Sequence, residues 1–171
     1  MTDYRIWHSS RDPYHCAFRI ISLLKEDGGA IRVEKLRILD MFFLYPPLLY
    51  RLSLPNEQKS NFRKLKITHP NKYFIRLPGT AAIWQDLQVF QSTALKQLTG
   101  RGLLRRDSLR DHRAHLMLEN VPQSILQAVE RQRMAEKYLL SFLIKDVGNL
   151  PVTGPKGLVR RAGIPARGPI L

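Results

Sequence analysis

Cysteine and acidic residues are scarce in this sequence, and no long uninterrupted apolar run occurs. Cys16 is the single cysteine among 171 residues, so no intrachain disulfide can form. The richest apolar stretch, residues 38–54, is interrupted by Asp40 and by Pro46-Pro47, which makes it too broken to span a bilayer. The first residues lack the apolar core of a signal peptide. We therefore expect a cytoplasmic protein.

The shortage of acidic residues leaves a large positive charge. Lys and Arg number 28 against 14 Asp and Glu, a formal net charge of +14. Residues 1–50 hold seven basic against six acidic residues, residues 51–113 hold thirteen against four, and residues 151–171 hold four against none. Such a field attracts polyanions, of which nucleic acid is the commonest, although an acidic protein partner is the alternative. The middle of the chain is expected to face the polyanion, and the first third to form core and protein contacts.

Apolar periodicity and breakers predict a series of helices followed by a small β element. Asp12-Pro13 is typical of a helix start and Gly28-Gly29 of its end. Residues 33–45 predict a buried helix, and Thr80 is a plausible N-cap for a long helix that ends near Gly100. Residues 103–106 and 114–118 predict two short strands around a charged loop, the hairpin called a wing. The order predicts a mainly α fold with a small β hairpin, a winged helix-turn-helix-like domain.

The same breakers divide the chain into three parts. Residues 1–118 form the expected winged-helix-like domain, with a basic insertion at 53–80. Residues 119–147 predict one long helix, which at about 1.5 Å per residue projects roughly 40 Å. Such a helix suits docking or dimerisation, or it packs back on its own domain, and the sequence leaves both open. Residues 148–171, rich in Pro, Gly and Arg, predict a tail that no core orders.

Basic residues of the middle segment are the candidates for DNA contact. Arginines around the expected wing suit phosphate oxygens because their guanidinium groups form hydrogen-bonded forks, whereas a solvated charged hairpin is the alternative. A second, weaker basic run lies in the insertion. The candidate DNA-binding residues are Arg63, Lys64, Lys66, Arg101, Arg105, Arg106, Arg110 and Arg113. The candidate partner-binding residues on the last helix are Tyr138, Phe142 and Leu143. The helix before the wing is expected to expose Gln85, Gln88, Gln91 and Thr93, without promise of base-specific recognition.

No pattern in the sequence indicates catalysis. His112 and His115 lie near Asp111, but a zinc site needs three or four converging ligands and Cys16 belongs to another element. His15 is adjacent to Cys16, and neighbours on a helix do not face each other, so a buried structural cysteine is expected. The segment 153–157 lacks the spacing and the Ser or Thr of a nucleotide-binding loop. We expect no enzyme activity, no metal and no cofactor.

Several hydrophobic and structural motifs resemble a known family. They are Asp12-Pro13-Tyr14-His15-Cys16-Ala17-Phe18-Arg19-Ile20-Ile21, Arg37-Ile38-Leu39-Asp40, Phe43-Leu44-Tyr45-Pro46, Phe90-Gln91, Ala94-Leu95 and Arg101-Gly102-Leu103-Leu104. Over roughly residues 12–145 the chain resembles the middle component of three-component ABC-ATPase conflict systems, including Lamassu-type anti-phage and anti-plasmid systems. The resemblance implies an accessory subunit whose partners are an SMC- or Rad50-like ATPase, an effector nuclease and DNA. It carries over no catalytic residue.

Two rival functions belong to other classes. A stand-alone winged-helix transcription regulator predicts a symmetric dimer and a defined operator, whereas an adaptor predicts weak, salt-sensitive DNA binding without sequence preference. A ribosome- or RNA-associated protein is favoured by the charge but not by the order of elements.

Overall fold

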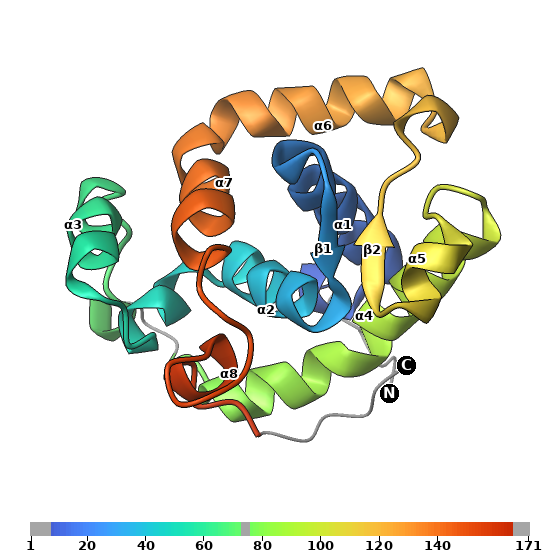
Figure 1. Ribbon diagram of the computed structural model, residues 1–171. Helices are drawn as coiled ribbons and strands as arrows, with labels where there is room; N and C mark the ends of the chain where they lie inside the picture. Colours follow the sequence, from blue (N-terminus) through green and yellow to red (C-terminus); the bar gives the residue numbers. More distant parts are fainter. Residues whose placement is uncertain (1–7, 73–75, 166–171) are drawn as a thin grey trace, which may run out of the picture.

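The computed structural model describes residues 8–72 and 76–165 and shows a mainly helical protein with one small antiparallel sheet. Residues 1–7, 73–75 and 166–171, which include parts of the expected insertion and tail, lie outside the described residues. Figure 1 shows α6 above α1, α4 below α2, and α3 and α5 at opposite ends. The helices are η1 (Ser9–Arg11), α1 (Pro13–Asp27), α2 (Val33–Leu44), η2 (Pro46–Arg51), α3 (Asn56–Lys64), η3 (Pro70–Lys72), α4 (Thr80–Gly100), α5 (Arg106–Arg110), η4 (Leu118–Asn120), α6 (Gln123–Ala135), α7 (Lys137–Phe142), the π-helical turn η5 (Leu143–Val147) and α8 (Leu158–Arg161). The strands are β1 (Ala30–Arg32) and β2 (Arg113–His115).

The first two predicted helices are confirmed, and their ends follow from local chemistry. The Asp12 carboxylate accepts hydrogen bonds from the N–H groups of Tyr14 and His15, which caps α1. Gly28 ends the helix with φ at 72°, a left-handed conformation that glycine adopts without steric cost. The long helix α4 is also confirmed, with Gly79 rather than Thr80 at its N-cap.

The small sheet joins the connection between α1 and α2 to the segment after α4. β1 pairs antiparallel with β2, so that Arg32 lies opposite Arg113. On the other side of β2, Leu104 and Leu116 form a single antiparallel bridge. The predicted flanks of the wing therefore do pair, and the loop between them contains α5. A mainly α fold with a small β element is confirmed, and the spatial order of β1, β2 and Leu104 is compatible with a winged helix.

A hydrogen-bonded polar network crosses the core and connects α1, α2 and α4. Asp40, which is 0% exposed, accepts hydrogen bonds from Arg19 Nε at 2.7 Å and Nη2 at 3.2 Å and from Gln91 Nε2 at 2.9 Å. Gln91 Oε1 in turn accepts a hydrogen bond from Arg37 Nε at 3.0 Å. The Arg37 guanidinium stacks over Trp84, 4.8 Å from the ring centroid. Hydrogen bonds among Arg19, Asp40, Arg37 and Gln91 thus fix the three helices in register inside the core.

The basic insertion forms a helix that docks beside the end of α7. Phe62 of α3 is buried. Its ring packs edge-on against Tyr50, with 4.8 Å between the ring centroids, and tilted against Phe142, with 5.9 Å between the centroids. The Asn61 amide donates to the Asp146 carboxylate at 2.8 Å. One buried aromatic side chain and one hydrogen bond therefore hold α3 onto the body, and its basic residues point outward.

The prediction of one continuous helix over 119–147 is wrong. The helix breaks at Glu136, and α6 packs against α1 while α7 and η5 pack against α1 and α2. Lys25 pairs with Glu130 at 2.7 Å and Arg133 with Glu26 at 2.6 Å, both between α1 and α6. Val129, Phe142 and Leu143 of the apolar stripe are buried in the chain's own core while Tyr138 stays exposed, which decides between the two alternatives in favour of packing back.

The prediction that no core orders the tail is also wrong for residues 149–165. Six apolar side chains of this segment lie in the hydrophobic core: Leu150, Val152, Leu158, Val159, Ala162 and Ile164. Glycines permit the tight path rather than disorder: Gly154 has φ at 90°, and Gly157 packs closely on the backbone of Thr153. The Arg161 guanidinium donates to the carbonyl of Ser53, which ties α8 to the start of the insertion. The composition of this segment thus resembles that of a disordered tail, although its glycines serve packed turns.

The polar network gives a first prediction. The substitution Asp40→Ala leaves the Arg19 guanidinium buried without its carboxylate, and we expect the free energy of unfolding to fall by about 3–5 kcal/mol. Urea unfolding followed by circular dichroism measures this change. As a control, Asp107→Ala removes an ion pair whose side chains are 84% and 85% exposed and changes stability by no more than about 0.5 kcal/mol. Equal unfolding midpoints for the two variants would contradict a central role of the network.

The docking of the tail gives a second prediction. A methyl group at Gly157 would lie 2.5 Å from the carbonyl group of Thr153, so Gly157→Ala should destabilise the protein by about 1–3 kcal/mol through overpacking. Gly100→Ala is the matched control, because Gly100 ends α4 with open space around it and alanine favours the helix. Thermal unfolding compares the two. A Gly157→Ala protein as stable as the parent would show that residues 149–165 do not need this path.

Candidate nucleic-acid interface

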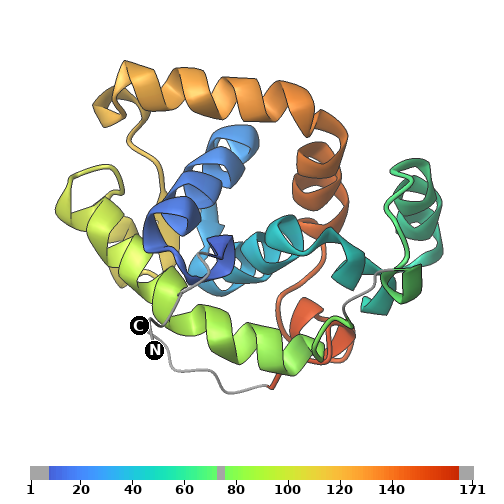
Figure 2. The same cartoon turned by 180° about the vertical axis from the view of Figure 1, so that it is seen from behind.

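The candidate DNA-binding residues form two separate surfaces. We call Arg101, Arg105, Arg106, Arg110 and Arg113 the wing surface, and Arg63, Lys64 and Lys66 the α3 surface. Figures 1 and 2, which show the molecule from front and back, place α3 and α5 at opposite ends. The structure therefore does not bring the two groups together, although all eight side chains are exposed.

The cations of both surfaces have few acidic neighbours. Within residues 8–72 and 76–165, Asp107 is the only carboxylate at ion-pair distance from any of the eight, 3.6 Å from Arg110. That pair is almost fully exposed and worth little. The Arg113 guanidinium also donates to the Ala30 carbonyl, and Lys64 to the Asn61 side chain at 3.2 Å. Most of their hydrogen-bond donors remain available to solvent or to an anion.

The backbone of the sheet decides which side chains join the wing surface. The Arg105 N–H donates to the His115 carbonyl at 3.0 Å, which extends the pairing beyond Leu104. Ile31 and Ala114 are buried, so by alternation Arg32 and Arg113 lie on the outward face. Arg32 therefore belongs beside the wing surface.

Arg32 and its neighbour Lys35 were not among the sequence candidates. Both belong to the first third of the chain, where nearly equal numbers of basic and acidic residues suggested a neutral core segment. The alternation of Ile31 and Val33 around Arg32 was the signal that could have placed it outward. Its position against Arg113 depends on pairing between strands more than 80 residues apart, which composition does not encode.

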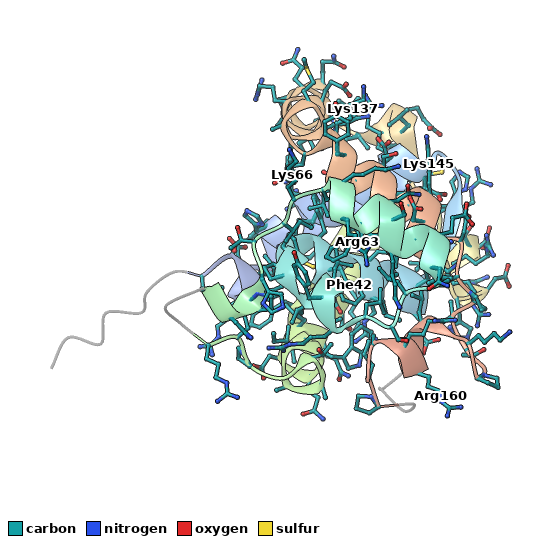
Figure 3. All side chains as sticks on the ribbon, turned by 90° about the vertical axis from the view of Figure 1, so that its left-hand side faces the viewer. Phe42, Arg63, Lys66, Lys137, Lys145 and Arg160 are labelled. Atoms are coloured by element: carbon teal, nitrogen blue, oxygen red, sulfur yellow. The ribbon has the colours of Figure 1, made fainter. Side chains whose placement is uncertain are left out.

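Further cations accompany the α3 surface. Figure 3 looks onto α3 and shows Lys137 of α7, Lys145 of η5 and Arg160 of α8 on the same side of the molecule as Arg63 and Lys66. These three side chains are exposed. The sequence separates them from the α3 surface by about 70 residues or more, so only the docking of α3 onto η5 reveals this wider basic side.

The outer face of α4 adds little charge to either surface. Gln91 is 0% exposed and belongs to the polar network, so its expected exposure is wrong. The exposed positions of α4 include Gln85, Asp86, Val89 and Lys96, of which Asp86 and Lys96 carry opposite charges. A helix with this face is poorly suited to bind the phosphates that line a DNA groove. The cations at the two ends are the better candidates for nucleic-acid contact.

Cys16 and His15, which were considered for catalysis, contact the buried polar network of Arg19 and Asp40. Cys16 is fully buried with its Sγ 3.7 Å from Asp40 Oδ2, and burial raises the pKa of its thiol. His15 Nδ1 lies 3.0 Å from Arg19 Nη1, and burial together with that guanidinium lowers the pKa of His15. The thiol thus stays protonated near neutral pH and is poorly suited to nucleophilic attack.

The two histidines of the wing and the glycine-lysine loop at 153–157 belong to different segments of the chain. His112 is exposed in the turn after α5, and His115 ends β2. Among the described residues, no group of three or more His, Cys, Asp or Glu side chains gathers in a way that could hold a metal ion. The segment 153–157 forms the turn that leads into α8. Over the same described ranges, no helix combines the length and hydropathy needed to cross a membrane.

The candidate partner-binding residues divide into one exposed and two buried side chains. Tyr138 is 78% exposed. Phe142 and Leu143 are 3% and 0% exposed and lie in the core, so they offer no surface to a partner. Met134, four residues before Tyr138, is 75% exposed and extends the apolar surface at the corner between α6 and α7. The sequence did not single out Met134.

Comparison with known proteins gives one result. Residues 5–166 match the family model described as ABC-three component (ABC-3C) system Middle Component 5. No curated protein and no solved structure matches. The match covers nearly the whole chain, including the insertion and the segment that contains α8.

Proposed function

Because this chain belongs to the Middle Component 5 family of ABC-three component systems, we propose that it is a non-catalytic accessory subunit that bridges an ABC ATPase and an effector nuclease and contacts DNA without sequence preference. The family match carries the first half of this proposal. The resemblance in residues 12–145 supports an SMC- or Rad50-like ATPase and a Lamassu-type anti-phage or anti-plasmid system. The eight exposed cations, with a single carboxylate within reach among the described residues, support the second half.

Non-specific DNA contact follows from the kind of groups that are exposed. Guanidinium and ammonium groups neutralise phosphates and release counterions, which gives affinity without reading bases. The outer face of α4, where a winged helix would read sequence, carries balanced charge. Electrostatic contact through the ends of the molecule is therefore the simplest mode of binding.

A stand-alone winged-helix regulator is the second candidate. The pairing of β2 with Leu104, both of which follow α4, and with β1, which lies between α1 and α2, favours it. It requires that α4 discriminate between operators, so a marked preference for one duplex over another of equal length and salt would favour the regulator over the accessory subunit.

Charge reversal tests the DNA contact. The triple variant Arg105→Glu, Arg106→Glu and Arg110→Glu should weaken binding to duplexes of unrelated sequence by the same factor. It should also reduce the slope of log affinity against log salt by about one for each lost phosphate contact. Fluorescence anisotropy at several salt concentrations measures both.

The control must change the net charge equally. Lys96→Glu, Arg131→Glu and Lys156→Glu reverse three exposed cations on α4, α6 and the loop before α8. A parallel variant at Arg63, Lys64 and Lys66 reports on the α3 surface. If wing and control variants bind DNA alike, the wing surface is not an interface and net charge alone explains the affinity.

Substitution at the corner between α6 and α7 tests partner assembly. Removing residues 119–147 would also remove core residues such as Val129 and Leu140, so surface changes are needed. Met134→Ser with Tyr138→Ala should abolish co-purification with the ATPase at an unchanged unfolding midpoint, since loss of a central aromatic contact costs about 2 kcal/mol or more.

Two exposed apolar side chains elsewhere provide the control. Tyr14→Ala with Val89→Ala changes residues that are 65% and 68% exposed, on α1 and α4. Assembly that survives the Met134 and Tyr138 changes but fails in this control would move the partner interface to the α1–α4 side.

A further inference from the structure

A small cavity lies where the sheet meets the first turn of α2. Its volume is about 170 Å³, and its wall includes side chains from β1, β2, α2 and the end of α1. Three of them, Arg32, Lys35 and Arg113, are cationic, and Asp27 is the only acidic one. The end of η5, at Gly148, closes the wall on another side. The cavity therefore has an excess of two positive charges.

Two of the cations face each other across the strand pair. Arg32 and Arg113 are directly opposite in the antiparallel register, an arrangement in which like charges destabilise a sheet. Within the described ranges, neither has a carboxylate at ion-pair distance. The Arg113 guanidinium donates one hydrogen bond to the Ala30 carbonyl. An anion between the two guanidinium groups would remove the repulsion.

Lys35 contributes the third charge from a fixed position. It is half-buried, and its ammonium donates to the Gly148 carbonyl. Burial lowers the pKa of Lys35, and although Asp27 opposes this, Arg32 and Arg113 add to it. Arg32 is also the N-cap of α2, a helix of 12 residues whose dipole is positive at this end. Every large electrostatic contribution here except that of Asp27 favours an anion.

We propose that this cavity binds a phosphate group between Arg32, Lys35 and Arg113. Two guanidinium forks and an ammonium match the oxygens of a phosphate, and the volume admits one phosphate but not a whole nucleotide. The group belongs to DNA or to a free nucleotide that leaves its base outside. In the DNA case the site deepens the proposed function and rests on it, because Arg105 continues the same outward face; binding of free phosphate does not depend on that function.

Phosphate titration followed by two-dimensional nitrogen–proton NMR tests the site. Inorganic phosphate should cause saturable shifts in the backbone amide signals of residues 32–35 and 113, and chloride at equal ionic strength should not. Arg32→Gln with Arg113→Gln should weaken phosphate binding about tenfold or more, as expected for loss of charge-assisted hydrogen bonds. Arg105→Gln with Arg106→Gln is the control at equal charge and should leave the phosphate affinity unchanged.

Further measurements identify the source of the phosphate and protect the test against misfolding. Arg32→Gln alone should weaken phosphate binding without lowering the unfolding midpoint, because it also removes the repulsion from Arg113. Weaker DNA binding in the double variant assigns the phosphate to DNA, whereas unchanged DNA binding with weaker ATP binding assigns it to a nucleotide. Absence of DNA binding by the parent protein refutes the proposed DNA contact and leaves the phosphate site standing. Shifts that do not saturate, equal phosphate affinity in the double variant, or equally tight binding of a glutamate-rich peptide would overturn the proposal.

Discussion

Asp40 lies at the centre of the protein and determines how the three main helices meet. Its two oxygens accept hydrogen bonds from Arg19 on α1 and Gln91 on α4, and Gln91 passes the connection on to Arg37 on α2. Buried charges are costly to desolvate, so such a network is tolerated only when every member is paired. Apolar packing alone would allow the helices to slide, whereas these directional contacts allow one register. The motifs that carry the family resemblance contain these same residues, and all four side chains are buried in the core.

The fixed core separates the charged ends of the molecule. The insertion carries its cations to one end through a single docked helix, and α5 with the segments beside it carries others at the opposite end. Between them, α4 exposes a face whose charges balance. A polyanion that contacts both ends would have to extend along the molecule, and one that contacts a single end leaves the other for an acidic partner. This division gives an accessory subunit two electrostatic surfaces at opposite ends of one fold.

The corner between α6 and α7 is different in character. Met134 and Tyr138 are exposed where the helix breaks at Glu136, while the residues that follow turn into the core. The break thus converts one apolar stripe into a buried part and an exposed part. It places an apolar surface on the side of α6 and α7, away from the wing surface and next to Lys137 of the wider basic side.

The sequence by itself determined the helical class, the ends of α1 and α2, the exposure of the eight candidate cations and the family resemblance, because capping, apolar period and charge are local properties. Only the tertiary structure decided the rest. The long helix and the disordered tail were wrong because a continuous apolar stripe does not reveal a break, and Gly and Pro serve tight packed turns as well as disorder. The separation of the two basic surfaces, the burial of Gln91 and Phe142, and the meeting of Arg32 with Arg113 all depend on contacts between segments far apart in the chain, which no local pattern specifies.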